Sequence, residues 1–91
     1  MTEAMFIKDP DAVLDYAFDW NTWLASGEII SSRVVTADTG LTKVSDSESS
    51  GIVTAWLSGG TAGTSYNVAC KIVTSDGRTE ERSITVLVRE R

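Results

Sequence analysis

The chain has 91 residues, a formal net charge of −5, three tryptophans, one cysteine and no histidine. This length fits a single domain, and the negative charge argues against a general nucleic-acid-binding protein. A single cysteine excludes an internal disulfide. No apolar stretch approaches the roughly 20 residues of a membrane-spanning helix, and the first residues lack the apolar core of a signal peptide. We therefore expect neither nucleic acid nor a membrane as a partner.

The charges are distributed unevenly along the chain. Residues 1–50 contain nine acidic and three basic residues, a net charge of −6, whereas residues 51–91 contain four acidic and five basic residues, a net charge of +1. One end of the molecule could thus meet a basic partner and the other an acidic one. A soluble surface with random patches of charge is the simpler interpretation.

Residues 1–11 are predicted to form an N-terminal arm, and residues 12–91 a single domain. The apolar residues Met5, Phe6 and Ile7 are followed by a turn signal that contains Pro10, the only proline. Such an arm either frays or docks Phe6 on a neighbouring protein.

Alternating side chains predict strands in the first half of the domain. In residues 13–20, four large apolar side chains alternate with small or acidic ones, which gives one dry and one wet face. In the second strand, alternation places Ile30 and Val34 on one face and Val35 on the other. The expected elements are strands at 13–20, 29–35, 41–44 and 52–57, a capped turn at 21–27, a mobile polar loop at 45–51 and a glycine-rich connection at 58–64.

The strand at 52–57 and the hairpin at 65–88 carry the clearest alternation. Val53, Ala55 and Leu57 fall on one face of the first, and Trp56 falls on the other. The hairpin turns at Asp76-Gly77. A two-residue loop there would place the apolar residues of its two strands on opposite faces.

A three-residue loop, 75–77, avoids this conflict in the hairpin. It pairs Val68 with Ile84 and Tyr66 with Val86, and it places Lys71 opposite Glu81 on the wet side. We therefore predict the three-residue loop, with Gly77 in the left-handed conformation beside a bulge.

No long helical periodicity occurs, and turn signals recur about every 8–12 residues. The predicted fold is an all-β, immunoglobulin-like antiparallel β-sandwich of about six to seven strands. A hairpin alone is marginal in water, so its dry face must meet another sheet.

The residues offer little for catalysis. Without histidine there is no serine–histidine triad and no common general base, and Cys70 lies on the predicted dry face. Carboxylates near Asp9 and Asp11 could share a cation with Asp46 or Glu48 if the loops converged, but the EF-hand spacing is absent, and solvated acids are the simpler interpretation. We expect no enzyme, no catalytic residues, no cofactor and no metal.

The aromatic residues are the best candidates for a contact surface. Trp20, Trp23 and Trp56 are large and amphipathic, and exposed tryptophan is enriched at protein interfaces and sugar-binding platforms. Alternatively, Trp20 and Trp23 fold over Trp56 as a small satellite cluster. The predicted interface residues are Trp20, Trp23, Trp56 and Phe6.

Three stretches together carry a family resemblance. They are KDPDAVLDY at 8–16 with WNTWL at 20–24, TAWLSGGTAGT at 54–64, and residues 66–91 with SDGR at 75–78. This arrangement resembles small structural proteins of tailed bacteriophages and prophages, of the fiber-tail adaptor or head–tail region type. Its motifs mark packing, so the resemblance assigns no site residues.

The resemblance implies a virion structural protein, made in the bacterial host cytoplasm. It would join tail or head–tail components through protein–protein contacts with other virion proteins, and assembly into a homo-oligomer is left open. The alternative function is a carbohydrate- or cell-surface-binding immunoglobulin-like module that uses a tryptophan platform.

Overall fold

Seven strands build the fold, and a computed structural model describes them over residues 4–90. No helix occurs among these residues. The all-β prediction and the expected number of strands are confirmed. The strands are β1 (Ala4–Lys8), β2 (Leu14–Asp19), β3 (Ile30–Ala37), β4 (Leu41–Ser49), β5 (Ile52–Gly59), β6 (Thr64–Thr74) and β7 (Thr79–Val88).

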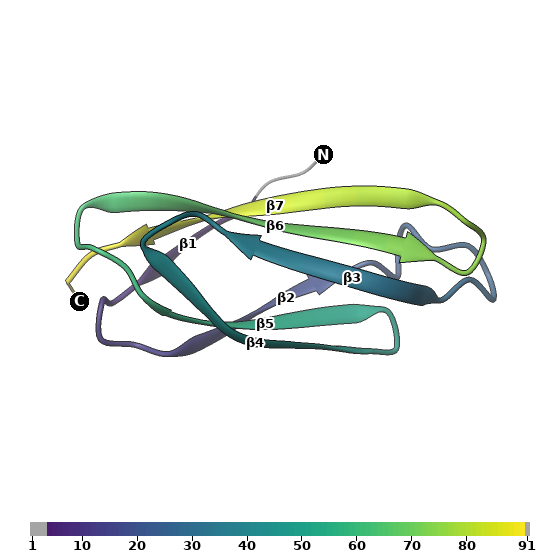
Figure 1. Ribbon diagram of the computed structural model, residues 1–91, viewed down its shortest axis with the longest axis horizontal. Helices are drawn as coiled ribbons and strands as arrows, with labels where there is room; N and C mark the ends of the chain where they lie inside the picture. Colours follow the sequence, from purple (N-terminus) through teal and green to yellow (C-terminus); the bar gives the residue numbers. More distant parts are fainter. Residues whose placement is uncertain (1–3, 91) are drawn as a thin grey trace.

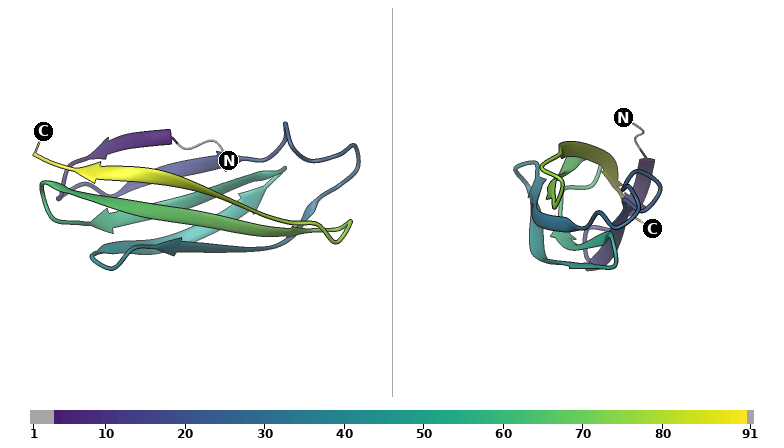
Figure 2. Two further views of the ribbon diagram at one scale, coloured as in Figure 1. Left: turned by 90° about the horizontal axis from the view of Figure 1, so that it is seen from above. Right: turned by 90° about the vertical axis from the view of Figure 1, so that its right-hand side faces the viewer.

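The strands form two facing sheets with the orders β1-β7-β6-β3 and β2-β5-β4 (Figures 1 and 2). All pairs are antiparallel except β1 and β7, which are parallel. The sandwich is elongated, with extents of 42 × 22 × 19 Å. The β2–β3 connection, the β4–β5 turn and the β6–β7 hairpin lie together at one end, on the right of Figure 1.

The core lies between the sheets because each strand alternates apolar and polar side chains. In β5, Val53, Ala55 and Leu57 are buried while Trp56 faces outward, as predicted. The buried apolar residues are Tyr16, Phe18, Trp20, Ile30, Val35, Leu41, Val53, Ala55, Leu57, Tyr66, Val68, Cys70, Ile72, Ile84, Val86 and Val88.

The β6–β7 hairpin has the register expected from burial. Val68 lies opposite Ile84, Tyr66 opposite Val86, and Lys71 opposite Glu81. The loop is closed by Thr74, whose N–H donates to the Arg78 oxygen at 2.8 Å and whose oxygen accepts from the Gly77 N–H at 3.0 Å. Gly77 has a φ of 83°, in the left-handed region, and the three-residue loop is confirmed.

The polar loop expected at 45–51 is wrong. Residues 45–49 continue β4 as an edge strand paired with β5, so only Ser50 and Gly51 remain in the turn. Both have positive φ angles, 53° and 83°, as the type I′ form of a two-residue hairpin turn requires. Serine-rich polar segments are compatible with a strand at a sheet edge, where one side of the ladder faces water.

The prediction that Ile30 and Val34 lie on the same face of the second strand is also wrong. A bulge between Ile30 and Ser32 shifts the pairing of β3 with β6 by one residue. Ile30 and Val35 therefore both reach the core, whereas Val34 is 60% exposed. One extra residue in a strand reverses every later side chain.

The N-terminal segment joins the sandwich through β1. Of the expected arm, residues 1–3 lie outside the described residues, and residues 4–8 pair in parallel with β7. Lys8 is buried at the end of β1, and its Nζ donates to the backbone oxygens of Asp9 at 2.9 Å and Gly59 at 2.8 Å. Burial lowers the pKa of Lys8, while Asp9 and Asp11 act in the opposite direction. This side chain ties β1 to the end of β5 in the other sheet.

Candidate functional site

The four residues predicted to contact a partner lie in three separate places. Trp20 and Trp23 pack edge to face beyond the end of β2, with ring centroids 5.6 Å apart. Trp56 lies on the outer face of the sheet β2-β5-β4, and Phe6 lies on β1 in the other sheet. The structure does not unite them in one surface, and their contact with a partner stays a prediction.

Trp20 closes one end of the core. Its side chain is 0% exposed, so it presents no contact surface in this fold. The Arg82 guanidinium group from β7 lies 4.3 Å over its ring centroid, and Arg82 Nη1 donates to the backbone oxygen of Asp19 at 2.7 Å. The backbone N–H of Trp20 donates to the backbone oxygen of Gly51 at 2.9 Å, which ties the end of β2 to the β4–β5 turn.

Trp56 occupies the middle strand of its sheet and is 41% exposed. Its register neighbours are Asp15 on β2 and Ser45 on β4. The outward residues of this sheet include two carboxylates and no cationic side chain. We call the outward residues around Trp56 the Trp56 face, which comprises Asp15, Ala17, Asp19, Ser45, Ser47, Ser49, Ile52, Thr54 and Trp56.

Phe6 is located at the edge where β1 and β2 approach each other. The centroid of its ring lies 5.1 Å from the centroid of the Tyr16 ring, and the angle between the two ring planes is 53°. The side chain is 37% exposed, so it both joins the two sheets and offers an apolar surface. This edge is distinct from the Trp56 face.

A buried carboxylate organises the end of the sandwich. Glu28 Oε1 accepts from the Ala25 N–H at 2.9 Å and from Arg78 Nη2. Glu28 Oε2 accepts from Thr74 Oγ1 at 2.5 Å and from Arg78 Nε at 2.9 Å. The Arg78 guanidinium group also lies 4.0 Å over the Trp23 ring centroid. These contacts fix the β2–β3 connection onto the β6–β7 hairpin.

The same hydrogen bonds lower the pKa of Glu28 to about 2 from its usual 4.5. Arg78 contributes most, then Thr74 and the Ala25 N–H, while burial acts in the opposite direction. Glu28 in turn raises the pKa of Arg78. Because two donors occupy each carboxylate oxygen, the roughly four acceptor positions are filled and none remains for a substrate. This cluster is therefore structural.

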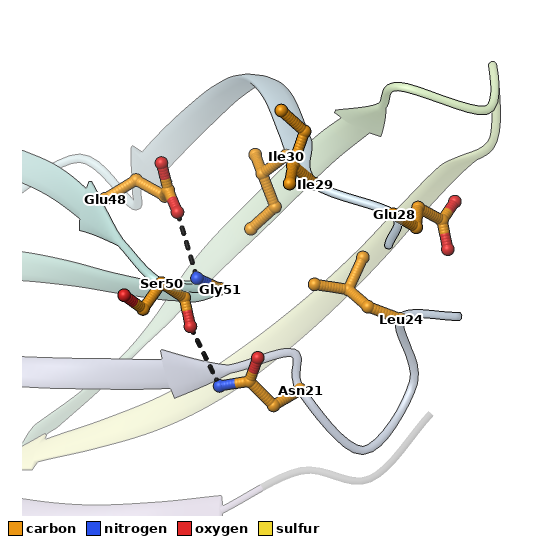
Figure 3. A pocket seen from close by; sticks show the side chains of 8 residues that line it. All are labelled: Asn21, Leu24, Glu28, Ile29, Ile30, Glu48, Ser50 and Gly51. Atoms are coloured by element: carbon orange, nitrogen blue, oxygen red, sulfur yellow. Dashed lines mark hydrogen bonds between the residues drawn. The ribbon is translucent and has the colours of Figure 1, made fainter. Parts of the chain in front are cut away.

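A cleft of about 380 Å³ opens beside this cluster, between the β2–β3 connection and the β4–β5 turn (Figure 3). Its apolar walls are formed by Leu24, Ile29 and Ile30, and its acidic residues are Glu28 and Glu48. In Figure 3 the Glu28 carboxyl group points away from Glu48, toward the outside of the cleft.

The β4–β5 turn at this cleft is held by side-chain hydrogen bonds. Asn21 Nδ2 donates to the Ser50 oxygen at 3.0 Å, and the Gly51 N–H donates to Glu48 Oε2 at 3.0 Å. A Cβ on Gly51 would lie 2.3 Å from Asn21 Oδ1. Only glycine fits here without moving Asn21.

The acids considered for a shared cation are not brought together. Asp9 lies near Gly59 at one end of β5, whereas Glu48 pairs with Val53 near the other end. Asp46 instead accepts from Arg33 at 2.7 Å and Lys43 at 2.5 Å, and Lys43 contributes most to its lowered pKa. Within residues 4–90, no group of three or more potential ligands could hold a metal ion.

Cys70 is buried in the core, as its place on the dry face predicts. Burial raises the pKa of the Cys70 thiol to about 11. A protonated, enclosed thiol is a poor nucleophile. Over the described part of the chain, no helix has the length and apolar character needed to cross a membrane.

Sequence reasoning missed the Glu28 cluster and the cleft. Glu28 bonds to residues 46 and 50 positions away, Thr74 and Arg78, so no local motif reveals them. The cleft also depends on the β4–β5 turn, which was expected to be a longer loop. The one available signal was an acidic residue placed directly before the apolar pair Ile29-Ile30.

Comparison with known proteins adds one assignment. No curated protein matches the chain. A family model described as podophage GP4 fiber-tail adaptor protein gp77 matches residues 8–87. This range includes β2 to β6 and almost all of β7, so it spans both sheets. The chain therefore belongs to the family of podophage GP4 fiber-tail adaptor proteins.

Proposed function

We propose that this tail adaptor docks its Trp56 face on another virion protein, by protein–protein contact and without catalysis. The observation that carries the proposal is the exposure of Trp56 at the centre of an uncovered sheet face. Tryptophan at the centre of a surface is typical of the few residues that dominate binding energy at protein interfaces.

The neighbours of Trp56 support docking by shape and charge. Small side chains of alanine, serine and threonine lie on the strands around Trp56, and the register of β4 shifts just before Ser45, its partner on that strand. These small side chains leave the indole ring accessible to another protein. Asp15 and Asp19 supply negative charge with no cation on the same face. A partner that presents arginine or lysine would match this charge, and arginine would also stack on the indole.

Several finer points belong to the same proposal. The protein acts in the virion after synthesis in the bacterial host cytoplasm, and it needs no nucleic acid, membrane, cofactor or metal. Phe6, at a separate edge, is proposed as a second apolar contact. Association of identical copies within the tail is compatible with this arrangement.

Reassembly of tails tests the proposal. Tails produced without this chain would be supplied with the purified wild type, Trp56→Ala or Val34→Ala, and fiber-bearing tails would be counted by electron microscopy. Val34 is a matched control because it is an exposed apolar residue on the other sheet. We expect Trp56→Ala alone to reduce fiber attachment by about tenfold or more, as loss of a dominant interface residue does.

Equal fiber attachment by the wild type and Trp56→Ala would contradict the proposed docking face. Binding of free glycans that is lost in Trp56→Ala would instead favour the sugar-binding alternative. Fiber attachment and glycan binding are measured with different ligands, so the wild type and Trp56→Ala together distinguish the two functions.

A further inference from the structure

The cleft at the end of the sandwich combines aliphatic walls with the carboxylate of Glu48, which is not part of an ion pair among the described residues. Leu24 and Ile30 line it, and Ile29 stands at its rim with 64% of its surface exposed. Glu48 Oε2 accepts one backbone hydrogen bond, from Gly51. Among the described residues, Glu48 Oε1 has no hydrogen-bond donor and Glu48 forms no ion pair.

The second acidic residue of the cleft does not compete for a ligand. Glu28 is paired with Arg78, and its carboxyl group points out of the cleft. Among residues 4–90, no cationic side chain lines the cleft. The charge available to an incoming group is therefore that of Glu48.

We infer that this cleft binds a lysine or arginine side chain presented by a partner protein. Such a side chain has an apolar stem and a cationic tip, which match the aliphatic walls and the Glu48 carboxylate. The volume of about 380 Å³ is at the small end of ligand pockets, which suits one inserted side chain better than a whole small-molecule cofactor.

The position of the cleft separates it from the Trp56 face. The cleft opens where the β2–β3 connection meets the β4–β5 turn (Figure 3), whereas Trp56 lies on the outer face of the sheet β2-β5-β4. An adaptor that joins two components needs two surfaces. The cleft supplies a second one without use of Trp56.

The walls of the cleft are fixed before a ligand arrives. Glu28 and Arg78 hold the β2–β3 connection, and Asn21 holds the β4–β5 turn. A preformed site loses less conformational entropy on binding than a mobile loop does.

Titration with a small probe, followed by backbone-amide NMR shifts, tests this inference on the isolated chain. The probe is N-acetyl-lysine methylamide, and N-acetyl-norleucine methylamide is the matched uncharged probe. We expect saturable shifts at Leu24, Ile29, Ile30 and Gly51 with the lysine probe. Binding should be about tenfold weaker with the norleucine probe, because the charge-assisted hydrogen bond is lost.

Two variants test whether the Glu48 carboxylate supplies the negative charge that binds the lysine probe. Glu48→Gln should weaken binding of the lysine probe by about tenfold. Glu90→Gln removes the same charge from an exposed residue beyond β7 and should leave binding unchanged. A wild-type titration at raised salt should also weaken binding, and it requires no variant.

Several results would overturn the inference. They are an absence of saturable shifts in the cleft, equal binding of the two probes, binding unaffected by salt, or equal effects of the Glu48 and Glu90 variants when both keep the dispersed spectrum of a folded protein. The test uses no phage component and no change at Trp56, so its failure is distinguishable from failure of the proposed docking face.

Discussion

Arg78 forms a side-on pair with the buried carboxylate of Glu28, and so joins the β6–β7 hairpin to the connection between β2 and β3. The two residues come from opposite halves of the sequence. Their contact joins a base from the second half of the chain to an acid from the first half, and Glu28 also lines the cleft beside the β4–β5 turn.

Acid should destabilise the protein through Glu28. Its pKa is about 2 in the folded state against a usual 4.5, so its stabilising contribution is complete above about pH 4.5 and is lost as the pH falls toward 2. Glu28→Gln should therefore lower stability at neutral pH and flatten the dependence of unfolding free energy on pH in this window. Denaturant unfolding at a series of pH values measures this.

Asp46 also has a lowered pKa and remains in the Glu28 variant, so some acid sensitivity should persist. Glu90→Gln is the matched control and should retain the wild-type profile. An unaltered profile in Glu28→Gln would show that the Arg78 contact does not stabilise the folded state.

Truncation of Trp20 to alanine should destabilise the protein far more than truncation of Trp56. Trp20 is fully buried, and truncation to alanine should cost about 3–5 kcal/mol of unfolding free energy. Trp56→Ala removes a half-exposed side chain and should cost about 1 kcal/mol or less. Chemical denaturation measures both. If the two costs were equal, Trp56 would be part of the core and not a surface residue.

Gly51 should be far less tolerant of alanine than Gly63. Both have left-handed φ angles, 83° and 89°, so alanine is strained at either position by about 1 kcal/mol or more. At Gly51 the new Cβ would also meet Asn21, whereas nothing lies within 4 Å of a Cβ at Gly63. The difference in unfolding free energy between the two variants reports the Asn21 contact.

A Gly51→Ala variant made in an Asn21→Ala background removes that contact and keeps the strained backbone. Its cost should fall to the Gly63→Ala value. A cost that stays high would assign the effect to the turn itself.

Cys70 should resist thiol reagents while the protein is folded. The thiol is buried, and burial raises its pKa to about 11, so little thiolate is present or accessible at neutral pH. A colorimetric thiol assay should show almost no reaction in buffer and one reactive thiol per chain in guanidinium. Rapid labelling without denaturant would contradict the described core.

Alternation of side chains was enough to predict the parts of the fold that depend on burial. The hairpin register followed from Val68 and Ile84, because a shift of one residue would have exposed one of them. The outward direction of Trp56 followed from the same period. These features are local, so they can be recognised in a single sequence.

Features that depend on irregular backbone or distant partners could not be predicted in this way. The bulge before Ser32 reverses Val34 and Val35, and no residue there marks it as a bulge. β4 extends to Ser49 because β5 pairs with it, although its serines suggest a loop. The Glu28–Arg78 pair joins loops whose proximity appears only once both sheets are assembled.

A cryo-electron microscopy reconstruction of a tail that contains this chain would show whether the Trp56 face is the docking surface of this protein. We expect another virion protein to cover Trp56 and its neighbours Asp15 and Ser45, with a cationic side chain of that protein near Asp15. A map in which the Trp56 face borders only solvent, while other surfaces carry every contact, would contradict the claim.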